Sequence, residues 1–419
     1  MCALLSVKEA RQRLLSNFIP LGVEKISLPE AAGRVLAEEI VAPYDLPPFP
    51  NSSMDGFAIR VSDVSGAGPE NPVTLSVVAD IPAGQVADFS LQPGQAARIM
   101  TGAPILTSAE AVIPVEDTDF NFRQPGVKLP EKVKVFRPVL MGENVRPAGQ
   151  DVQAGEVVMH PGSRLRPQDI GFLSMLGLAK VPVHRLPRIA IFSTGDELLP
   201  VEAPLRPGKI HDANSYILIS SVEKAGGEAV HLGIVPDEAE AVKACLDKAV
   251  SEEVDLILSS AGVSVGAFDF VRSVVEQHGV LDFWRVNMRP GKPLAFGHYQ
   301  GIPFIGLPGN PVSAFVGFEV FVYPALAKLA GMSETGRLTQ SVQLLEAVDS
   351  DGRESYLRAF VSQEDGRRVA RLTGHQGSGN LRSLVQANSL LLIPSGVKSL
   401  PAGVEVEAWM LGEIKSSTG

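Results

Sequence analysis

The stretch that decides the fold is VDLILSSAGVSVGAFDF, residues 254–270. An apolar run ends in two serines, a loop of small residues follows, and Asp269 stands just beyond the loop. A short apolar run of this length is typical of a buried strand. In an open α/β sheet, ligands bind outside the carboxyl ends of the strands, where such loops lie. The stretch therefore predicts an α/β domain with a site at the edge of its sheet.

Strands and helices alternate around this stretch, which predicts a parallel, doubly wound sheet. The predicted strands are RIAIFSTGDEL (188–198), AVHLGIV (229–235), VDLILSS (254–260) and LDFWRV (281–286). The predicted helices run from about Ala213 to Ala225, from an N-cap at Asp237 to about residue 250, and over about 270–278. GIPFIGLPGNP precedes a further helix, which is long and apolar.

The regions on either side have other patterns, so several domains are expected. Short β-rich runs separated by Gly and Pro precede the α/β region, and β-type patterns return after it, with turn signals at Asp351-Gly352 and Asp365-Gly366. The sequence predicts a helical and extended N-terminal domain (1–57 and 140–179), a β-rich domain (58–139), the α/β domain (180–332) and a C-terminal, barrel-like β domain (333–419).

Composition and charge exclude several classes of function. Two cysteines provide no disulfide framework, and the N-terminus lacks the apolar core of a signal peptide. The most apolar window, 311–329, is short for a membrane span and contains Glu319 and Pro324. We therefore expect a soluble, cytoplasmic protein without a membrane partner. A net charge of −10 argues against nucleic acid as a partner, although a local cationic cluster can still bind a small anion.

Three loops rich in glycine and hydroxyl groups follow apolar strands: STGDE (193–197), SSAGVSVGAFD (259–269) and GLPGNPVS (306–313). Small residues let backbone N–H groups approach a ligand, so the loops together predict a cradle for an anion. The candidate residues are Thr194, Gly195, Gly262, Ser264, Gly266, Pro308, Gly309, Asn310 and Pro311. The alternative for Asn310-Pro311 is a well-formed helix start, and both roles are compatible.

A basic cluster lies in WRVNMRPGKPLAFG, residues 284–297. Arg285, Arg289 and Lys292 place three positive charges within eight residues, and two prolines stiffen the backbone between them. Alone, the cluster would be interpreted as a solvated edge. Beside anion-cradling loops in an acidic chain, it is interpreted as a clamp for phosphate or another oxyanion.

Carboxylates in the same region are candidate metal ligands. Glu197, Asp237 and Asp269 supply hard oxygen atoms, which suit Mg²⁺. The alternative for each aspartate is a helix cap, and Asp212 and Asn214 in HDANS have the same two interpretations. The histidines are scattered without the spacing of a zinc site.

The spacing Gly262-x-Ser264-x-Gly266 also matches the nucleophile elbow of serine hydrolases. An elbow needs a sharp turn from strand to helix, and here Ser259, Ser260 and Ala261 separate the apolar run from Gly262. The loop therefore favours an anion cradle over a nucleophile.

Taken together, the motifs resemble those of the molybdopterin molybdenumtransferases, the family of MoeA-type proteins and the gephyrin E domain. The resemblance extends nearly from end to end of the chain, through NSSMDGFAIR (51–60), RIMTGAPI (98–105), GQDV (149–152), FSTGDEL (192–198), HDAN (211–214), GVSVG (262–266) with Asp269, RPGKP (289–293), GLPGNPVSA (306–314) and GHQGS (374–378). It departs from the family at Ala261, where glycine is usual, and at Arg285 and Arg289, where lysine is frequent.

The resemblance implies an L-shaped homodimer that binds adenylylated molybdopterin in its α/β domain, inserts molybdate and releases AMP with the help of Mg²⁺. It also implies a molybdopterin adenylyltransferase as a partner. The family's site residues correspond to Asp55, Thr101, Asp151, Glu197, Asp237, Asp269, Arg285, Arg289, Pro308, Pro311 and Ser378. Asp55 and Thr101 would reach the pocket from the partner subunit.

Two other classes remain alternatives at this stage. A molybdopterin adenylyltransferase shares the α/β domain, but the roughly 180 residues before that domain and the β-rich tail count against it. A binding protein with an inactive pocket is the non-enzymatic alternative, against which the retained carboxylates count.

If the loop around Ser264 is a cradle, Ser264→Ala should keep most of the turnover, and a fluorophosphonate probe should not label the protein. The physical reason is that no strained turn exposes the hydroxyl as a nucleophile. Intact-mass spectrometry after incubation with the probe measures the labelling. Stoichiometric labelling that disappears in Ser264→Ala would establish the hydrolase interpretation instead.

Overall fold

The computed structural model describes residues 4–120, 128–261 and 270–416, which form two compact units. Unit 1 comprises Met1–Glu38, Pro161–Ile170 and Ala179–Gly419. Unit 2 comprises Glu39–His160 and Gly171–Leu178. The α/β region and the C-terminal β region therefore belong to one compact unit, and the division into four domains stays a prediction.

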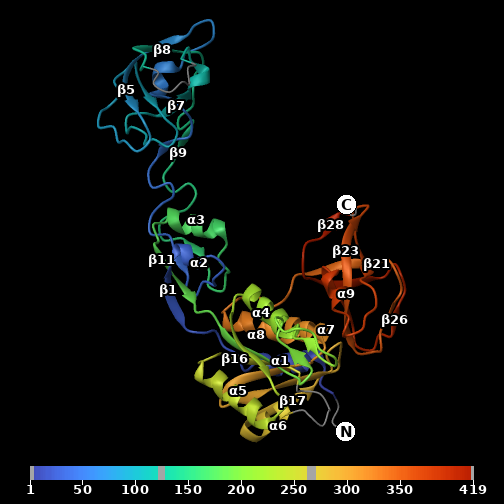
Figure 1. Ribbon diagram of the computed structural model, residues 1–419. Helices are drawn as coiled ribbons and strands as arrows, with labels where there is room; N and C mark the ends of the chain where they lie inside the picture. The colour runs from blue at the N-terminus through green and yellow to red at the C-terminus, as the bar shows by residue number, and fades with distance from the viewer. Residues whose placement is uncertain (1–3, 121–127, 262–269, 417–419) are drawn as a thin grey trace. The chain divides into compact units, whose positions relative to one another are not determined.

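The sheet at the centre of unit 1 has six strands in the order β15-β12-β16-β20-β19-β17 (Figure 1). Four of them pair in parallel: β12 (Arg188–Thr194), β15 (Glu228–Val235), β16 (Leu256–Ser260) and β20 (Ile302–Leu307). The other two, β17 (Gly279–Arg285) and β19 (Pro293–Tyr299), are antiparallel to their neighbours, so the prediction of a fully parallel sheet is wrong for them. Their connections, residues 286–292 and the turn Gln300-Gly301, are too short for a parallel crossover.

Helices cover both faces of this sheet, which confirms the doubly wound arrangement. Figure 1 shows α5 (Ala239–Ser251) and α6 (Phe270–His278) on one face, and α4 (Asn214–Ala225) and α8 (Tyr323–Leu329) on the other. Each face has its own apolar core. Helix α4 ends at Gly226, whose φ of 90° supplies the left-handed residue that closes many helices.

The N-cap prediction for Asp237 is wrong. Helix α5 begins at Ala239, and its N-cap is Glu238, whose backbone is extended with φ −134° and ψ 134°. Asp237 stands one residue earlier, so its carboxylate is not used by the first turn of α5 and remains available for other contacts.

The apolar helix after β20 runs continuously from Pro311 to Leu329, as α7 (Pro311–Gly317), a π-helical turn η3 (Phe318–Val322) and α8. Its length and composition would allow it to cross a membrane, but 83% of this segment is buried inside the protein. It packs in the same core as the N-terminal helix α1 (Val7–Leu15). Glu319 within it forms a buried ion pair with Arg337, at 2.5 Å from Oε2 to Nε. These features are those of a core helix.

The C-terminal part of unit 1 is a closed barrel, which confirms the predicted barrel-like domain. Strand β23 (Glu354–Glu364) pairs with both β24 and β25, and the ring closes through β24 (Arg367–Leu372), β21 (Thr339–Leu344), β27 (Glu405–Met410) and β25 (Ser389–Ile393). The hairpin turn between β23 and β24 is the predicted Asp365-Gly366. Strand β18 (Met288–Arg289) extends the ring by pairing with the start of β23.

Unit 2 is built on a five-stranded sheet in the order β7-β4-β6-β5-β8, in agreement with the β-rich pattern of its sequence. The strands are β4 (Gly56–Ile59), β5 (Val73–Ile81), β6 (Gln95–Ile99), β7 (Ala111–Pro114) and β8 (Lys132–Val135). Apolar cores lie on both sides of this sheet. Two short ladders complete the unit, β2 (Ile40–Val41) with β10 (Val157–Met159) and β3 (Asn51–Ser52) with β9 (Val145–Arg146).

The remaining elements are short. They are α2 (Leu28–Ala31), α3 (Pro167–Met175), α9 (Leu381–Val385), β1 (Val23–Ser27) with β11 (Lys180–His184), β13 (Leu198–Leu199) with β14 (Ile210–His211), β22 (Val348–Asp349) with β26 (Ser399–Leu400), β28 (Lys415–Ser416), and the 3₁₀ turns η1 (Val61–Val64) and η2 (Val115–Asp117).

Gly56 allows β4 to fit between β6 and β7. A Cβ at this position would lie 2.1 Å from the carbonyl oxygen of Ile113, so Gly56→Ala should destabilise unit 2 by about 1–3 kcal/mol. Far-UV circular dichroism should show loss of β structure at a lower temperature. Both tryptophans, Trp284 and Trp409, belong to unit 1, so their fluorescence should report no early change.

The matched control is Gly66→Ala, because a Cβ at Gly66 would have no atom within 4 Å. It should melt like the unaltered chain. An unchanged circular dichroism transition in Gly56→Ala would contradict the close approach of β4 and β7.

Candidate functional site

The edge of the α/β sheet contains a topological switch point. From β12 the chain passes through α4 to β15 on one side, and it then returns through α5 to β16 on the other side of β12. The loops after β12 and β16 therefore lead away in opposite directions. Ligands of open α/β sheets bind in the crevice that forms at this place.

Two polar side chains at the start of α4 organise this edge. Asn214 is buried, and its Nδ2 donates to Ser260 Oγ and to the carbonyl oxygen of Gly309, both at 2.7 Å. Asp212 accepts from Ser193 Oγ at 3.2 Å and from the backbone N–H of Ser215 at 3.1 Å. Asp212 thus fits the helix-cap alternative, whereas Asn214 ties the ends of β16 and β20 to α4.

Hydrogen-bonding capacity remains unused at this edge. Asn214 Oδ1 and Ser259 Oγ are buried and have no hydrogen-bond partner in residues 4–120, 128–261 and 270–416. A buried polar atom without a partner costs about 1–3 kcal/mol, so such atoms are expected where a ligand or another segment binds.

A cavity of about 510 Å³ opens beside this edge within unit 1. Pockets of this size are typical of small-molecule sites. In the part of the chain that the structure describes, three cationic side chains and no carboxylate line it. The lining residues are Ala261, Arg289, Pro290, Gly291, Lys292, Pro293, Pro308, Gly309, Asn310, Ser313, Arg353, Gln376, Gly377 and Ser378.

The cavity brings together several residues that the sequence predicted. Arg289 and Lys292 of the predicted clamp face the same space as Pro308, Gly309 and Asn310, and Ser378 joins them from the barrel. Clustered cations without a carboxylate attract a small anion even in a chain with a net charge of −10. The predicted oxyanion clamp therefore has a place to hold its ligand.

The structure confirms the helix-start interpretation of Asn310 and Pro311, and their role in binding an anion stays a prediction. Asn310 is the extended N-cap residue, and Pro311 is the first residue of α7. The side chain of Asn310 makes no cap bond, however, and its Nδ2 donates to Ser378 Oγ at 3.0 Å. The backbone N–H of Val312 also donates to the Ser378 carbonyl, at 3.2 Å. The start of the helix is thus joined to the barrel loop that lines the cavity.

Arg358, which no sequence motif predicted as a site residue, is fully buried in β23. Its guanidinium donates to Ser383 Oγ at 3.0 Å and to the backbone carbonyls of His375, Gln376 and Gly377 at 3.0–3.2 Å. Among the described residues it forms no ion pair. Burial, and then the charge of Arg289, lower its pKa to about 10.

Arg358 therefore fixes the loop that carries Gln376, Gly377 and Ser378 to the cavity, and its uncompensated charge adds to the positive potential there. Gln376 reinforces this attachment, since its side chain accepts from the Arg358 N–H at 2.9 Å and donates to the Arg358 carbonyl at 3.1 Å. The signal in the sequence was an arginine inside an otherwise apolar strand pattern, SYLRAFV.

Three carboxylates gather at the ends of β12 and β15. The backbone N–H of Asp237 lies 3.4 Å from Asp196 Oδ1. Glu197 folds back over Gly195, where a Cβ would lie 2.7 Å from Glu197 Oε2 and where φ is 151°, so the loop requires glycine. Burial, and then the charges of Asp196 and Glu197, raise the pKa of Asp237.

The carboxylate oxygens of Asp196, Glu197 and Asp237 are hard donors of the kind that Mg²⁺ prefers, and their like charges repel one another. Within the described residues, no group of three or more His, Cys, Asp or Glu side chains is arranged so that it could hold a metal ion. Asp269, the third carboxylate that the sequence predicted as a metal ligand, lies outside the described residues.

The other predicted residues have different positions. Arg285 is exposed at the end of β17, with its guanidinium 5.6 Å from the ring centre of Trp284, and it does not line the cavity. Thr194 is buried at the end of β12. Like Asp269, the predicted loop residues Gly262, Ser264 and Gly266 lie outside the described residues.

Asp55, Thr101 and Asp151 belong to unit 2. Asp55 Oδ1 accepts from the backbone N–H of Thr101 at 2.8 Å and from its hydroxyl at 2.7 Å, so these two are held as a pair. Asp151 is exposed, and its backbone N–H donates to the Leu46 carbonyl.

Comparison with known proteins explains why these motifs occur together. A molybdopterin molybdenumtransferase of Mycobacterium tuberculosis is 40% identical to this chain over 394 residues, which cover 92% of this chain and 94% of the relative. The chain belongs to the molybdopterin molybdenumtransferase family. The resemblance drawn from the motifs is thus confirmed. The corresponding protein of Haemophilus influenzae is 36% identical and covers 96% of this chain and 98% of its own length.

Family profiles match in the same order as the predicted regions. The MoeA N-terminal region (domain I and II) matches residues 5–177, a probable molybdopterin binding domain matches 190–328, and the MoeA C-terminal region (domain IV) matches 341–411. A molybdopterin biosynthesis MoeA protein of Pyrococcus horikoshii has a similar structure, with a TM-score of 0.81 at 35% identity over 97% of this chain and all of that chain. Matches on both sides of the α/β domain distinguish this chain from an adenylyltransferase made of that domain alone.

The raised pKa of Asp237 predicts an effect on stability. The folded protein binds the proton of this carboxyl more tightly than the unfolded chain, so the stabilising contribution is complete at low pH and is lost as the pH rises from about 4 through the raised pKa. Without added divalent metal, Asp237→Asn should therefore melt about 1 °C higher at pH 7. The gain should shrink as the pH falls and should vanish well below 3.8, the ordinary pKa of this group, where the carboxyl is protonated in both states.

Differential scanning fluorimetry in the presence of a chelator measures this difference. Asp282→Asn is the matched control, because it removes an exposed carboxylate from β17 of the same sheet. A lower melting temperature for Asp237→Asn at pH 7 would show that the carboxylate is stabilised by its surroundings rather than strained by them.

Proposed function

We propose that this chain inserts molybdate into adenylylated molybdopterin and releases AMP, as a step in the biosynthesis of the molybdenum cofactor. Relatives that are 34–40% identical are named molybdopterin molybdenumtransferases, and residues 190–328 match a probable molybdopterin binding domain. The observation that carries the proposal is the cavity with Arg289, Lys292 and Arg353, because both molybdate and the phosphates of the substrate are anions.

The cavity residues would bind and orient these anions. A guanidinium forks onto two oxygen atoms, so Arg289 and Arg353 would fix orientation, whereas the Lys292 ammonium supplies a point charge. The positive end of the helix dipole at Pro311 favours negative charge near the start of this helical run. Donors placed in advance at the position of developing charge lower the barrier to transfer.

Mg²⁺ is proposed as the cofactor, with Glu197, Asp237 and Asp269 as the residues that would hold it. The raised pKa of Asp237 beside two further carboxylates supports this, since a bound cation would relieve their repulsion. When bound, the ion would neutralise charge on the phosphate oxygens of the departing AMP.

The proposal includes a homodimer. Asp55 and Thr101 hold each other in a fixed geometry in unit 2, and these two residues would complete the site of a partner subunit. A molybdopterin adenylyltransferase would supply the substrate, and the reaction would take place in the cytoplasm.

The test is AMP release from adenylylated molybdopterin by the purified full chain with Mg²⁺, measured by chromatography with and without molybdate. We expect release that depends on molybdate. Arg289→Ala should raise KM for molybdate about 10–100-fold, because a charge-assisted contact is lost, and Arg289→Lys should lose less. AMP release that is the same without molybdate would contradict the proposed reaction.

The matched control for Arg289→Ala is Arg367→Ala, which removes an exposed arginine at the start of β24 outside the cavity. It should leave both KM and kcat unchanged. If both variants reduce the rate equally, the effect follows from the net charge of the protein rather than from the clamp.

A further inference from the structure

Arg353 lines the cavity and lies next to β18, the strand that contains Arg289 of the predicted clamp. It precedes β23, whose first residues pair in parallel with β18: Met288 lies opposite Glu354, and Arg289 lies opposite Ser355. Arg353 and Arg289 thus belong to one small piece of sheet. Contacts that hold Arg353 in place therefore also restrain β18, the strand that contains Arg289.

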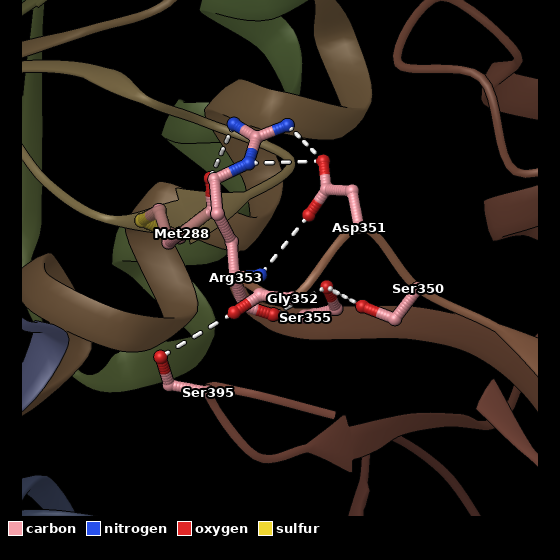
Figure 2. Close-up of polar contacts among 7 residues, drawn as sticks. All are labelled: Met288, Ser350, Asp351, Gly352, Arg353, Ser355 and Ser395. Carbon is pink, nitrogen blue, oxygen red and sulfur yellow. Dashed lines mark hydrogen bonds and ion pairs between the residues drawn. The ribbon is translucent and has the colours of Figure 1, made fainter. Parts of the chain in front are cut away.

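The guanidinium of Arg353 is held on two sides (Figure 2). Its Nε lies 3.0 Å from Asp351 Oδ2, its Nη2 bonds to the same oxygen, and its Nη1 donates to the Met288 carbonyl at 3.0 Å. These contacts occupy most of the N–H groups of the side chain. Because a guanidinium is planar, the direction of the remaining N–H groups is fixed as well.

The carboxylate that holds Arg353 is itself attached to a rigid turn. Asp351 Oδ1 accepts from the backbone N–H of Arg353 at 3.1 Å, and Gly352 between them has a φ of 87°. Figure 2 shows the neighbouring hydroxyls of Ser350 and Ser355, which are 2.9 Å apart. The predicted turn at Asp351-Gly352 joins β22 to β23, which do not pair with each other. It places the Asp351 carboxylate beside Arg353, which lines the cavity.

Asp351 places a negative charge beside two of the cavity's cations without lining the cavity itself. Hydrogen bonds from Arg353, and then the charge of Arg289, hold the pKa of Asp351 below its usual range. The carboxylate is therefore ionised at neutral pH. It offsets one of the three positive charges that an anion in the cavity would meet.

We propose that Asp351 is a positioning residue that limits how tightly the cavity holds a tetrahedral, dianionic oxyanion: it anchors Arg353 and cancels part of the cationic charge. The inference rests on the proposed function, in which the oxyanion is a substrate that has to leave the cavity during transfer. An oxyanion bound too tightly in its ground state would raise the barrier to that step.

Binding of free molybdate and free sulfate to the full chain tests this inference without turnover. By isothermal titration calorimetry at low salt, Asp351→Asn should bind both dianions about fivefold more tightly, the order expected for removing one nearby charge in water. The gain should be equal for the two anions, because it comes from charge and not from shape. At about 0.5 M salt most of it should disappear.

Three further variants separate this role from others. Asp349→Asn removes the same charge from an exposed position of the barrel and should change nothing. Arg353→Ala should weaken the binding of both anions, because it removes one of the three cations that line the cavity. Asp351→Ser keeps a short acceptor for the Arg353 N–H without the charge, and it should reproduce the gain if Asp351→Asn folds poorly.

Weaker or unchanged anion binding in a folded Asp351→Asn or Asp351→Ser, or an equal gain in Asp349→Asn, would overturn the inference. Absence of any binding of molybdate and sulfate to the unaltered chain would overturn it as well. The AMP-release assay is independent of these titrations, so failure of the proposed function and failure of the Asp351 role give different results.

Discussion

The buried amide of Asn214 is the constraint on which the candidate site depends. Its two hydrogen bonds of 2.7 Å, to Ser260 Oγ and to the Gly309 carbonyl, join the start of α4 to the ends of two neighbouring strands. If Asn214 lost these partners, its buried amide would have no hydrogen-bond partner, which costs free energy. The start of α4, the end of β16 and the loop after β20 therefore keep their relative positions. The loops of the switch point are thereby held where a ligand of the sheet would bind.

A buried cation performs the corresponding task on the barrel side. Arg358 directs its donors at three successive backbone carbonyls, from His375 to Gly377, and so holds the loop that contributes Gln376, Gly377 and Ser378 to the cavity. Burying a charge without a carboxylate is costly. If the cavity binds an anion, as we propose, that anion would offset part of this cost by supplying an opposite charge. The α/β side of the cavity is thus held by a buried amide, and the barrel side is held by a buried guanidinium.

Strain and repulsion are concentrated at the same edge. Ala261 adopts a φ of 74°, which is uncommon for a residue with a side chain, and it lines the cavity. The carboxylates of Asp196, Glu197 and Asp237 repel one another. Backbone strain and charge repulsion of this kind are typical of ligand-binding sites. The apolar cores on both faces of the sheet supply the stability that offsets their cost.

The sequence by itself determined the α/β alternation, the barrel-like tail, the family and part of the cavity lining, because apolar periodicity and loop composition are local properties. Only the tertiary structure decided that β17 and β19 are antiparallel to their neighbours, that Glu238 rather than Asp237 caps α5, and that Arg285 does not line the cavity with Arg289 and Lys292. It alone revealed Arg353 and Arg358, whose partners are a turn carboxylate and distant carbonyls. Residues of one short segment can point in different directions, and contacts between distant segments depend on how the chain packs, which no local pattern encodes.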